Sequence, residues 1–434
     1  MGEQTFPKSG VIMKKIIATA LSLLAAGILI SVCSKSSEKV SVEIWHTYNG
    51  IQQEYLVQAA QEFNASQDKY EVKVLDQDAS GFADIVYNAV ANKIGPSIIF
   101  NYGSTAVDYA KEGLAVDIRK YIDEDVRSGD TTMRDLIASL PDAMQDDVRG
   151  FDDGGIYYLP GCTTGPVFFY NKAIFDELSL APPRDWNELE QVSKTIYEKK
   201  GIPGFHSDGL VDNIQMLIMQ NGLGYIDVEK KQVAFSADKL AEIYQWYADN
   251  CAKGYFEFNT VGKYSSEDLA TGVLGSFSGS CVNDQYITML TGELGIAPWI
   301  SSSNGRSFYT AWNRGPIFLA RSEKVDRGAY EFVKFFLAPQ MNAGWAKANS
   351  ALSPYRTTQG DEDYMAYVSN LPSTSALPSV QANLPASGSF PNVRGGSQVR
   401  NILEEYLNNV VGGKMSALEA AEAVVRECNE ALAD

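Results

Sequence analysis

Apolar positions along the first third of the chain follow two different periods. Short apolar or alternating segments predict strands, and segments with apolar residues three or four positions apart predict helices. The predicted strands are Val40–Tyr48, Tyr70–Asp76 and Ser97–Tyr102, and the predicted helices are Ile51–Phe63, Gly81–Ala91 and Ser104–Glu112. Strands and helices that alternate in this way predict an α/β domain with a largely parallel sheet.

The pattern changes after residue 155. Two apolar strands, IYYLP and PVFFYN, are separated by Gly161–Gly165, and helical spacing predominates from there on. The predicted helices are Asp185–Lys199, Ala237–Ala252, Tyr330–Leu337, Met341–Ala348, Gln398–Val411 and Ser416–Leu432, with strands at Gly272–Ser280, Leu294–Trp299 and Gly315–Ala320. The stretch Gln359–Ser397 is rich in Ser, Pro, Gly and Asn, which predicts a loop.

The N-terminal region has the pattern of an export signal. Lys14 and Lys15 precede an apolar run, Ile16–Val32, which is followed by Cys33 and the polar stretch Ser34–Lys39. A positive segment before a short apolar one is typical of a secretory signal peptide, and about 17 residues is the low limit for a membrane span. We therefore expect residues 1–33 to be a signal peptide and 34–39 to be a tether.

Cys33 at the end of the apolar run has two interpretations. Ile-Ser-Val-Cys before a Ser/Lys-rich stretch resembles a bacterial lipoprotein signal, in which the Cys becomes the lipidated first residue. The alternative is a cleaved secretory signal with an incidental Cys, because Val32 stands where the lipoprotein pattern prefers a small residue. The acidic residue Glu3 does not fit a signal, so we expect translation to start at Met13.

Composition limits the classes of partner. The chain has 54 Asp and Glu residues against 36 Lys and Arg residues, a formal net charge of −18. Nucleic-acid-binding domains need a basic surface, so nucleic acid is not expected as a partner. A single buried Arg can still bind a small anion, because it overrides the net charge locally. At roughly 150 residues per domain, 434 residues predict two or three domains.

Motifs for catalysis or metal binding are largely missing from the sequence. The two histidines, His46 and His206, are too few for a His-rich metal site, and there is no HExxH, GxSxG or Rossmann glycine pattern. Asp152 and Asp153 are followed by two glycines, which predicts a turn. Paired carboxylates of a hydrolase remain the alternative. The cysteines after Cys33 fit no zinc motif, and either disulfides or buried free thiols are possible for Cys162, Cys251, Cys281 and Cys428.

Several blocks of sequence together resemble one protein family. The blocks are EIWHTYNG (Glu43–Gly50), EFNASQDKYEVKV (Glu62–Val74), GPSIIF (Gly95–Phe100), YNKAIFDELSLAPPRDWNEL (Tyr170–Leu189) and Gln398–Ala421. They resemble the extracellular solute-binding proteins, many of them lipoproteins, of ABC importers of the maltose and glycerol-3-phosphate type. The last block is similar to the glycerol-3-phosphate branch. The resemblance covers nearly all of residues 40–432.

The resemblance implies a fold of two α/β lobes, each a sheet flanked by helices, joined by crossing hinge strands. We expect the N-terminal lobe to hold residues 40–160 and 300–338. The C-terminal lobe is expected to hold residues 161–299 and 339–434. The crossings are expected at Leu159–Asn171, Pro298–Arg314 and Ala338–Gly344, with the apolar strand before Asn171 in the second sheet and Trp186 packing the helix that follows.

The resemblance also implies where a ligand binds: at the ends of the first strands and at the crossings. The candidate residues are Trp45, His46, Phe82, Tyr102, Gly103, Thr163, Thr164, Phe277, Ser278, Trp312, Asn313, Arg314 and Arg394. Phe82 replaces a Tyr of the glycerol-3-phosphate relatives, Gly103 replaces a Glu, and Asn313 with Arg314 replaces Gly-Gly. The scaffold is kept and the pocket differs, so the ligand need not be glycerol 3-phosphate.

Two kinds of side chain suggest the ligand's chemistry. Trp45, Phe82, Trp299 and Trp312 can stack on a sugar ring, although core packing is the alternative for each. Arg314 or Arg394, if it faces the cleft, offers a forked donor suited to a phosphate or carboxylate. The alternative for each Arg is an ion pair with a surface carboxylate.

The predicted function is the substrate-binding component of an ABC transporter, which captures a sugar, oligosaccharide or glycerol-3-phosphate-like solute between two lobes. Partners would be the solute, permease subunits in the membrane and a lipid anchor on an exported, monomeric chain. The ligand undergoes no chemistry, and no cofactor, metal or nucleic acid is expected. The alternatives are an exported carbohydrate-active hydrolase and a structural surface lipoprotein or adhesin.

Overall fold

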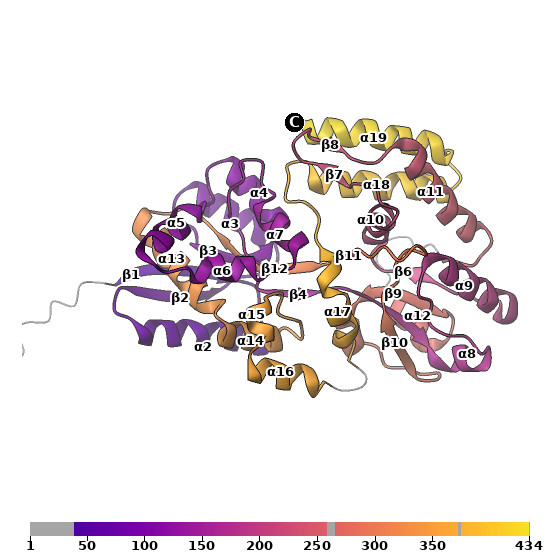
Figure 1. The fold of residues 1–434 in the computed structure, drawn as a ribbon, viewed down its shortest axis with the longest axis horizontal. Coiled ribbons are helices and arrows are strands. Elements are labelled where there is room, and N and C mark those ends of the chain that lie inside the picture. The colour runs from indigo at the N-terminus through magenta and orange to yellow at the C-terminus, as the bar shows by residue number, and fades with distance from the viewer. Residues whose placement is uncertain (1–38, 258–264, 372–374, 434) are drawn as a thin grey trace, which may run out of the picture.

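The computed structural model describes residues 39–257, 265–371 and 375–433, which form two lobes side by side along the long axis of the molecule (Figure 1). Each lobe is built on one sheet with helices packed against it. The expected signal peptide, Cys33 and the tether up to residue 38 lie outside the described residues. Both lobes are mixtures of helix and strand, so the predicted α/β fold class is confirmed.

The first sheet brings together strands from distant parts of the chain. Its order is β2 (Tyr70–Asp76), β1 (Val40–His46), β3 (Ile98–Tyr102), β12 (Trp312–Phe318) and β4 (Cys162–Thr164). β1 is parallel to β2 and β3, whereas β12 is antiparallel to β3 and β4. The residues that end β3 and those that begin β12 therefore meet at one edge of the sheet, where the chain leaves for the second lobe.

Helices cover both faces of the first sheet, because side chains of β3 point alternately to the two sides. Ile98 and Phe100 join the core beneath α2 (Gly50–Ser66), α13 (Glu323–Phe336) and α14 (Pro339–Ala348). Ile99 joins the opposite core with α3 (Phe82–Ala91) and α4 (Gly103–Lys111). The short helices α5 (Arg119–Ser128), α6 (Thr132–Ala138) and α7 (Asp142–Arg149) complete the lobe.

The second sheet has the order β10 (Leu294–Pro298), β5 (Pro166–Asn171), β9 (Ser276–Ser280) and β6 (His206–Ser207). The apolar strand PVFFYN is thus central, and it buries Phe168 and Phe169 on opposite faces. Trp186 packs in the same core as Phe168, and its indole nitrogen donates to Gln220 Oε1 at 2.6 Å. The apolar strand before Asn171 thus belongs to the second sheet, and Trp186 packs the helix that follows, as the sequence predicted.

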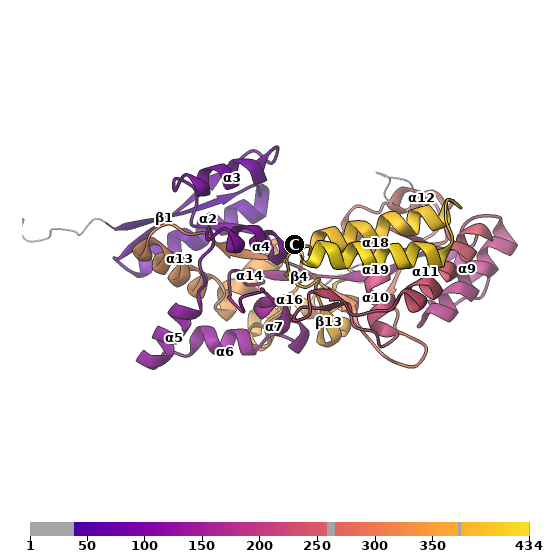
Figure 2. The same ribbon diagram turned by 90° about the horizontal axis from the view of Figure 1, so that it is seen from above.

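Helices surround the second sheet, and the last two in the chain lie beside α11 (Figures 1 and 2). They are α8 (Lys172–Glu177), α9 (Trp186–Lys200), α10 (Leu210–Gln220), α11 (Ala237–Ala252), α12 (Ser265–Thr271), α18 (Gly396–Val411) and α19 (Ala417–Ala433). The N-terminus of α18 points back towards the first lobe (Figure 2). It is therefore positioned to contribute side chains at the junction.

Two of the three expected crossings coincide with changes of sheet. Gly165 alone separates β4 of the first sheet from β5 of the second, and the chain returns between β10 and β12. The expected crossing at Ala338–Gly344 is wrong. Those residues begin α14, which packs on α2 of the first lobe: Tyr55 Oη donates to the carbonyl oxygen of Met341 at 2.7 Å, and Trp345 is fully buried in the first core.

The boundary expected at residue 338 therefore does not match the packing. α15 (Arg356–Gln359) and α16 (Glu362–Ser369) still pack on α14, whereas α17 (Leu377–Asn383) packs on β10 and β5 of the second sheet. The reason is the buried face of α14, whose Ala343, Trp345 and Ala346 have the apolar character that the first lobe requires. The chain after α14 therefore serves both lobes: Leu352 and Tyr367 already contact the core around Phe169, and α17 packs on the second sheet itself.

Most predicted helices and strands are found with small shifts at their ends, but α13 begins at Glu323 and not at the predicted Tyr330, and β9 begins at Ser276 and not at the predicted Gly272. Other expectations fail. IYYLP forms no strand; Tyr158 makes only an isolated bridge to Ile317. The expected loop Gln359–Ser397 contains α16 and α17, and Asp361 caps α16 by accepting from the Tyr364 amide at 3.0 Å. The helices α5 to α7, α10 and α12 were not predicted. Most of them are short, and α10 is buried on nearly all sides, so it has no polar face to give a helical period.

Cysteines and charged clusters support no further site in the described chain. Four thiols are free, of which Cys162, Cys281 and Cys428 are buried, so the expectation of buried thiols holds and that of disulfides does not. Within residues 39–257, 265–371 and 375–433, no group of three or more His, Cys, Asp or Glu side chains is arranged to hold a metal ion. No helix in these ranges has the length and apolarity needed to cross a bilayer.

Candidate functional site

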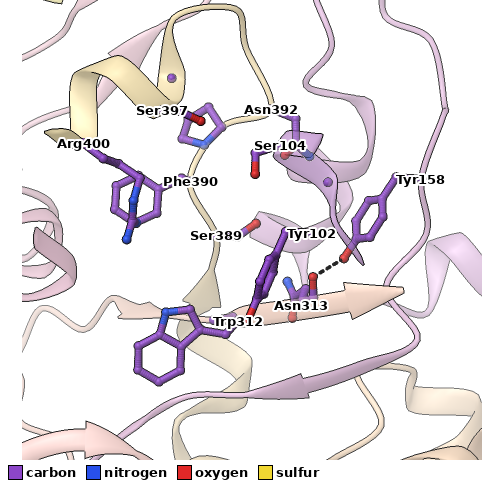
Figure 3. A pocket seen from close by; sticks show the side chains of 14 residues that line it. Tyr102, Ser104, Tyr158, Trp312, Asn313, Ser389, Phe390, Asn392, Ser397 and Arg400 are labelled. Atoms are coloured by element: carbon purple, nitrogen blue, oxygen red, sulfur yellow. Dashed lines mark hydrogen bonds between the residues drawn. The ribbon is translucent and has the colours of Figure 1, made fainter. Parts of the chain in front are cut away.

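Two adjoining cavities lie where the two lobes meet. The first, which we name the Arg400 cavity, has a volume of about 340 Å³ (Figure 3). It is lined by Tyr102, Gly103, Ser104, Tyr158, Ala311, Trp312, Asn313, Ser389, Phe390, Pro391, Asn392, Gly396, Ser397 and Arg400. Its wall thus combines the β3–α4 and β12 regions of the first lobe with the start of α18 in the second.

The second cavity, which we name the Arg314 cavity, has a volume of about 330 Å³. It is lined by Gln52, Tyr102, Cys162, Thr164, Ser280, Val282, Trp312, Arg314, Asn349 and Ala351. Tyr102 and Trp312 belong to both walls, so the two cavities are neighbours. Both have the size of small-molecule sites, which is roughly 300–1,000 Å³.

β12 supplies the central side chains because of its register. Trp312 pairs with Thr164 of β4, and Arg314 pairs with Cys162 of β4 and Tyr102 of β3. Residues two apart on a strand point to the same face. Trp312 and Arg314 accordingly share the Arg314 cavity, whereas Asn313 between them lines the Arg400 cavity.

The turn from β3 into α4 allows the first lobe to approach the second closely. A Cβ atom at Gly103 would lie 2.6 Å from Nδ2 of Asn392, so a larger residue there would displace the Asn392 side chain. Asn392 Nδ2 also donates to the carbonyl oxygen of Asp147 in α7 at 2.8 Å. These contacts hold the segment before α18 against the first lobe and leave Tyr102, 43% exposed, at the mouth of both cavities.

Polar groups deeper in the Arg400 cavity come from β12. Tyr158 Oη donates to the backbone carbonyl of Asn313 at 2.7 Å, which fixes the strand at the back of the cavity (Figure 3). The side-chain oxygen of Asn313 is buried without a hydrogen-bond partner among the described residues. A buried amide oxygen without a donor is unfavourable, and a ligand hydroxyl is a suitable donor.

Charge in the Arg400 cavity is balanced by one carboxylate beside it. Arg400 Nη1 lies 3.0 Å from Asp212 Oδ1 of α10, and the guanidinium lies 3.6 Å from the centroid of the Phe390 ring. Burial raises the pKa of Asp212, while the neighbouring Arg400 and Trp312 side chains lower it. The ion pair therefore orients Arg400 on the wall of the cavity, and the carboxylate neutralises much of the charge of the guanidinium.

The structure brings together about half of the residues expected to bind ligand. Tyr102, Gly103, Trp312 and Asn313 line the Arg400 cavity, and Thr164 and Arg314 line the other. The remaining candidates line neither: Trp45, His46, Phe82, Thr163, Phe277, Ser278 and Arg394.

The positions of these remaining residues explain why they line neither cavity. Phe277 is fully buried and stacked on Phe169, at 5.0 Å between ring centroids, so it is core. Ser278 Oγ and Ser207 Oγ are 3.1 Å apart inside the second lobe. Thr163 is buried on β4, where its amide donates to Leu352, and His46 is buried and accepts from the Tyr48 amide.

Trp45 and Phe82 pack against the core beneath α3 and α4. Arg394 lies two residues before the start of α18, and the guanidinium that lines the cavity is that of Arg400, in the first turns of the same helix. The resemblance pointed to an Arg in this segment, and the Arg of this segment that lines a cavity is Arg400. The difference arises because Gly395, with φ of 76°, turns the chain into the helix between the two residues.

Sequence reasoning missed the residues that the segment before α18 contributes. Ser389, Phe390, Asn392 and Arg400 were assigned to an undifferentiated loop and a terminal helix. Gln52 and Asn349 were also missed; their side chains hydrogen-bond to each other at 3.2 Å across the Arg314 cavity wall. A glycine pair directly before an amphipathic helix was the only local signal for the first group.

A sequence profile decides the family. That of the bacterial extracellular solute-binding proteins matches residues 49–343, more than half of the chain. This chain belongs to that family. The expected membership of the solute-binding proteins of ABC importers is thereby confirmed, and a pair of cavities between two lobes is the geometry that such a protein needs.

Relatives and solved structures of solute-binding proteins extend over nearly the whole chain. The sn-glycerol-3-phosphate-binding periplasmic protein UgpB of Brucella abortus (strain 2308) is 24% identical, with 95% of this chain and 98% of that protein covered. The cyclic α-maltosyl-1,6-maltose binding protein of Arthrobacter globiformis is 21% identical, with a TM-score of 0.79 and coverage of 91% and 99%. The sugar-binding protein MalE of Xanthomonas citri is 17% identical, with a TM-score of 0.74 and coverage of 91% and 98%. These two structures share the fold of this solute-binding protein.

Proposed function

We propose that this solute-binding protein captures a saccharide or glycerol-phosphate compound in the two cavities and delivers it to ABC permease subunits. The observation that carries the proposal is the composition of the Arg400 cavity, whose walls come from both lobes. Tyr102 and Trp312 belong to the first lobe, and Phe390 and Arg400 belong to the second. The names of the relatives, which bind glycerol 3-phosphate or maltose-type sugars, support this class of ligand.

The side chains suit a molecule with an apolar face and several hydroxyl groups. Trp312 and Tyr102 offer aromatic faces against which a sugar ring can pack. Asn313 offers an unpaired acceptor, and Asn392 and Ser104 add further polar groups. Such a mixture of a few directed polar groups with aromatic surface orients a ligand and selects among stereoisomers.

Closure of the lobes follows from this two-sided wall. A solute that contacts both lobes does so fully only when they approach, so its affinity is higher for the closed form. That difference in affinity shifts the population towards closure, and the permease then recognises the closed lobes. The solute needs no chemical change in this cycle.

The hydrolase alternative receives no support from the cavities. A glycosidase needs two carboxyl groups that flank the substrate, roughly 5–9 Å apart. None of the described residues that line the Arg400 or Arg314 cavity is Asp or Glu. Asp212 and Asp147 contact residues of the Arg400 cavity wall, and both carboxylates are engaged: Asp212 pairs with Arg400, and Asp147 accepts from Ser389.

Export and anchoring complete the proposal. The basic and apolar N-terminal residues followed by Cys33 support secretion and lipid attachment, which would hold a monomeric receptor at the outer face or periplasmic side of the cell membrane. There it would meet the permease subunits.

Thermal-shift measurements on the purified protein without residues 1–33 test the proposed ligand class. A ligand that binds only the native state raises Tm. We expect maltose, maltotetraose or sn-glycerol 3-phosphate to raise Tm, and Trp312→Ala to abolish the rise while the fold is retained. The matched control is Tyr286→Ala, which removes a side chain that is 76% exposed and lines neither cavity. No rise with any of these solutes at millimolar concentration would contradict the proposal.

A further inference from the structure

Arg314 is set into the wall of the Arg314 cavity by its strand partners on both sides, Tyr102 and Cys162. Its guanidinium lies 5.3 Å from the centroid of the Tyr48 ring and 5.8 Å from that of Tyr102. Its Nε is buried without a hydrogen-bond partner among the described residues. The side chain is therefore held between two aromatic rings with unused donors.

The charge of Arg314 is also uncompensated. Arg400 in the neighbouring cavity has Asp212 at 3.0 Å, but no carboxylate in residues 39–257, 265–371 and 375–433 lies within the 4.0 Å that defines an ion pair with Arg314. A guanidinium stays charged at any physiological pH. A partly buried cation without an anion is unfavourable, and contact with two aromatic rings offsets only part of that cost.

The first turn of α2 adds to the positive potential at this cavity. Gln52 in that turn lines the cavity, and the helix has no acidic residue in its first turn. The N-cap residue, Asn49, makes no side-chain capping hydrogen bond. Asn49 therefore leaves the N–H groups at the start of this 17-residue helix uncapped, and the helix dipole places partial positive charge there.

The rest of the cavity wall is neutral. Thr164, Ser280 and Asn349 offer hydroxyl and amide groups, and Val282 and Ala351 are apolar. In a chain with a net charge of −18, a ligand-sized cavity whose described lining residues include an Arg and no carboxylate is a local reversal of sign. Such a site attracts an anion despite the overall charge.

We propose that the Arg314 cavity is an anion-binding subsite, so that the solute is a saccharide carrying a carboxylate or phosphate group. This inference rests on the proposed function. The sugar ring packs in the Arg400 cavity against Trp312 and Tyr102, which both cavities share, and the anionic group accepts hydrogen bonds from Arg314. A forked guanidinium suits either a carboxylate or a phosphate, because both present two oxygens in one plane.

Matched probes separate the contribution of the anionic group to the affinity from that of the sugar ring. The affinities of glucose, glucuronate, glucose 6-phosphate and inorganic phosphate are measured by calorimetry at low and high potassium chloride. Glucuronate or glucose 6-phosphate is expected to bind about tenfold or more tightly than glucose, and that advantage is expected to shrink with salt. The two charged sugars distinguish a uronic acid from a sugar phosphate.

Variants of the purified protein test whether the preference for charged sugars depends on Arg314. Arg314→Gln is expected to remove the advantage of the charged sugars over glucose. Arg394→Gln, which changes an Arg outside both cavities, is the matched control and is expected to behave as the parent protein. Arg314→Met, whose apolar chain fits between the two Tyr rings, replaces the Gln variant if that variant does not fold.

Three results would overturn the subsite: no charged probe binds more tightly than glucose, the Arg314 variants keep the charged-sugar advantage, or they weaken glucose and charged sugars equally. Maltotetraose serves as the reference for the broader proposal. If it binds the parent protein while the charged sugars gain nothing from Arg314, the anion subsite fails and the saccharide receptor stands. If no probe binds, both fail.

Discussion

Asp147 of α7 accepts two hydrogen bonds from Ser389, one from the backbone N–H at 2.7 Å and one from the hydroxyl at 2.6 Å. Ser389 lines the Arg400 cavity, whereas Asp147 belongs to the first lobe. One carboxyl group thus holds the segment before α18 against the first lobe. Burial raises the pKa of Asp147 to about 7, although both hydrogen bonds from Ser389 oppose the rise.

The raised pKa of Asp147 predicts a pH dependence of stability. A carboxyl group whose folded pKa exceeds its unfolded value, 3.8, contributes stability that is complete below that value and is lost as pH rises through about 7. Between pH 4 and 7.5 we expect the unfolding free energy of Asp147→Asn to improve by about 4 kcal/mol relative to the parent protein, since Asn cannot ionise. Urea denaturation across this window measures the difference, and parallel pH profiles would refute the role of Asp147.

Trp312 is predicted to carry much of the affinity for the solute, because its indole lines both cavities. Trp312→Ala should weaken binding by about 1.5–3 kcal/mol, the value of burying one large apolar side chain. Trp312→Phe keeps a ring and should lose less. Calorimetry with whichever solute raises Tm provides the comparison, and equal affinities for Ala and Phe would mean that ring stacking does not contribute.

The sequence predicted the scaffold well, because long periodic segments such as Ala237–Ala252 and the apolar strand at Val167 carry their own signal. The residues that line the cavities were harder to predict from the sequence. Trp312 and Arg314 were found through family resemblance, whereas Arg400 and Asn392 approach the site only because Gly103 and Gly395 permit close packing of segments that are almost 300 residues apart. Phe277 looked like a site residue from its position and proved to be core, since the face on which a strand residue points is decided by register.

The packing of α14 leads to a third prediction, which concerns the stability of the first lobe. Trp345 is fully buried against Tyr48, Phe100 and Phe336, with ring centroids 5.2–5.3 Å away. Trp345→Ala should lower the free energy of unfolding by about 3–5 kcal/mol, because it leaves a large cavity in the core. Trp45→Ala, at a half-buried position outside this core, is the control and should cost clearly less in chemical denaturation. Equal losses would argue against α14 as part of the first lobe.

Cys33 is predicted to carry the lipid that retains the protein at the membrane. Cys33→Ser removes the thiol that would be acylated, so the protein should move from the membrane fraction to the soluble exported fraction. Immunoblotting of cell fractions checks the outcome. Retention of the variant at the membrane through an uncleaved Ile16–Val32 segment would contradict lipid anchoring. If the parent protein is also found in the soluble exported fraction, the signal is an ordinary cleaved one.

The pair formed by Asp212 and Arg400 is predicted to link stability to binding. Asp212 is only 5% exposed and already has a raised pKa, so Arg400→Ala leaves a buried carboxylate without its cation. We expect a loss of about 3 kcal/mol at neutral pH. The folded pKa of Asp212 rises further in this variant. A raised folded pKa gives stability at low pH that is lost as pH rises, so the deficit should shrink as pH falls towards 4.

The double variant Arg400→Ala with Asp212→Asn identifies the cause of this loss. An amide at position 212 cannot ionise, so the double variant should recover part of the stability at neutral pH and show no pH-dependent deficit. Its affinity for the solute should remain low, because Arg400 and its contact with Phe390 are still missing from the cavity wall. A deficit of Arg400→Ala that is the same at every pH would show that lost packing on Phe390, and not the unpaired Asp212 carboxylate, destabilises the protein.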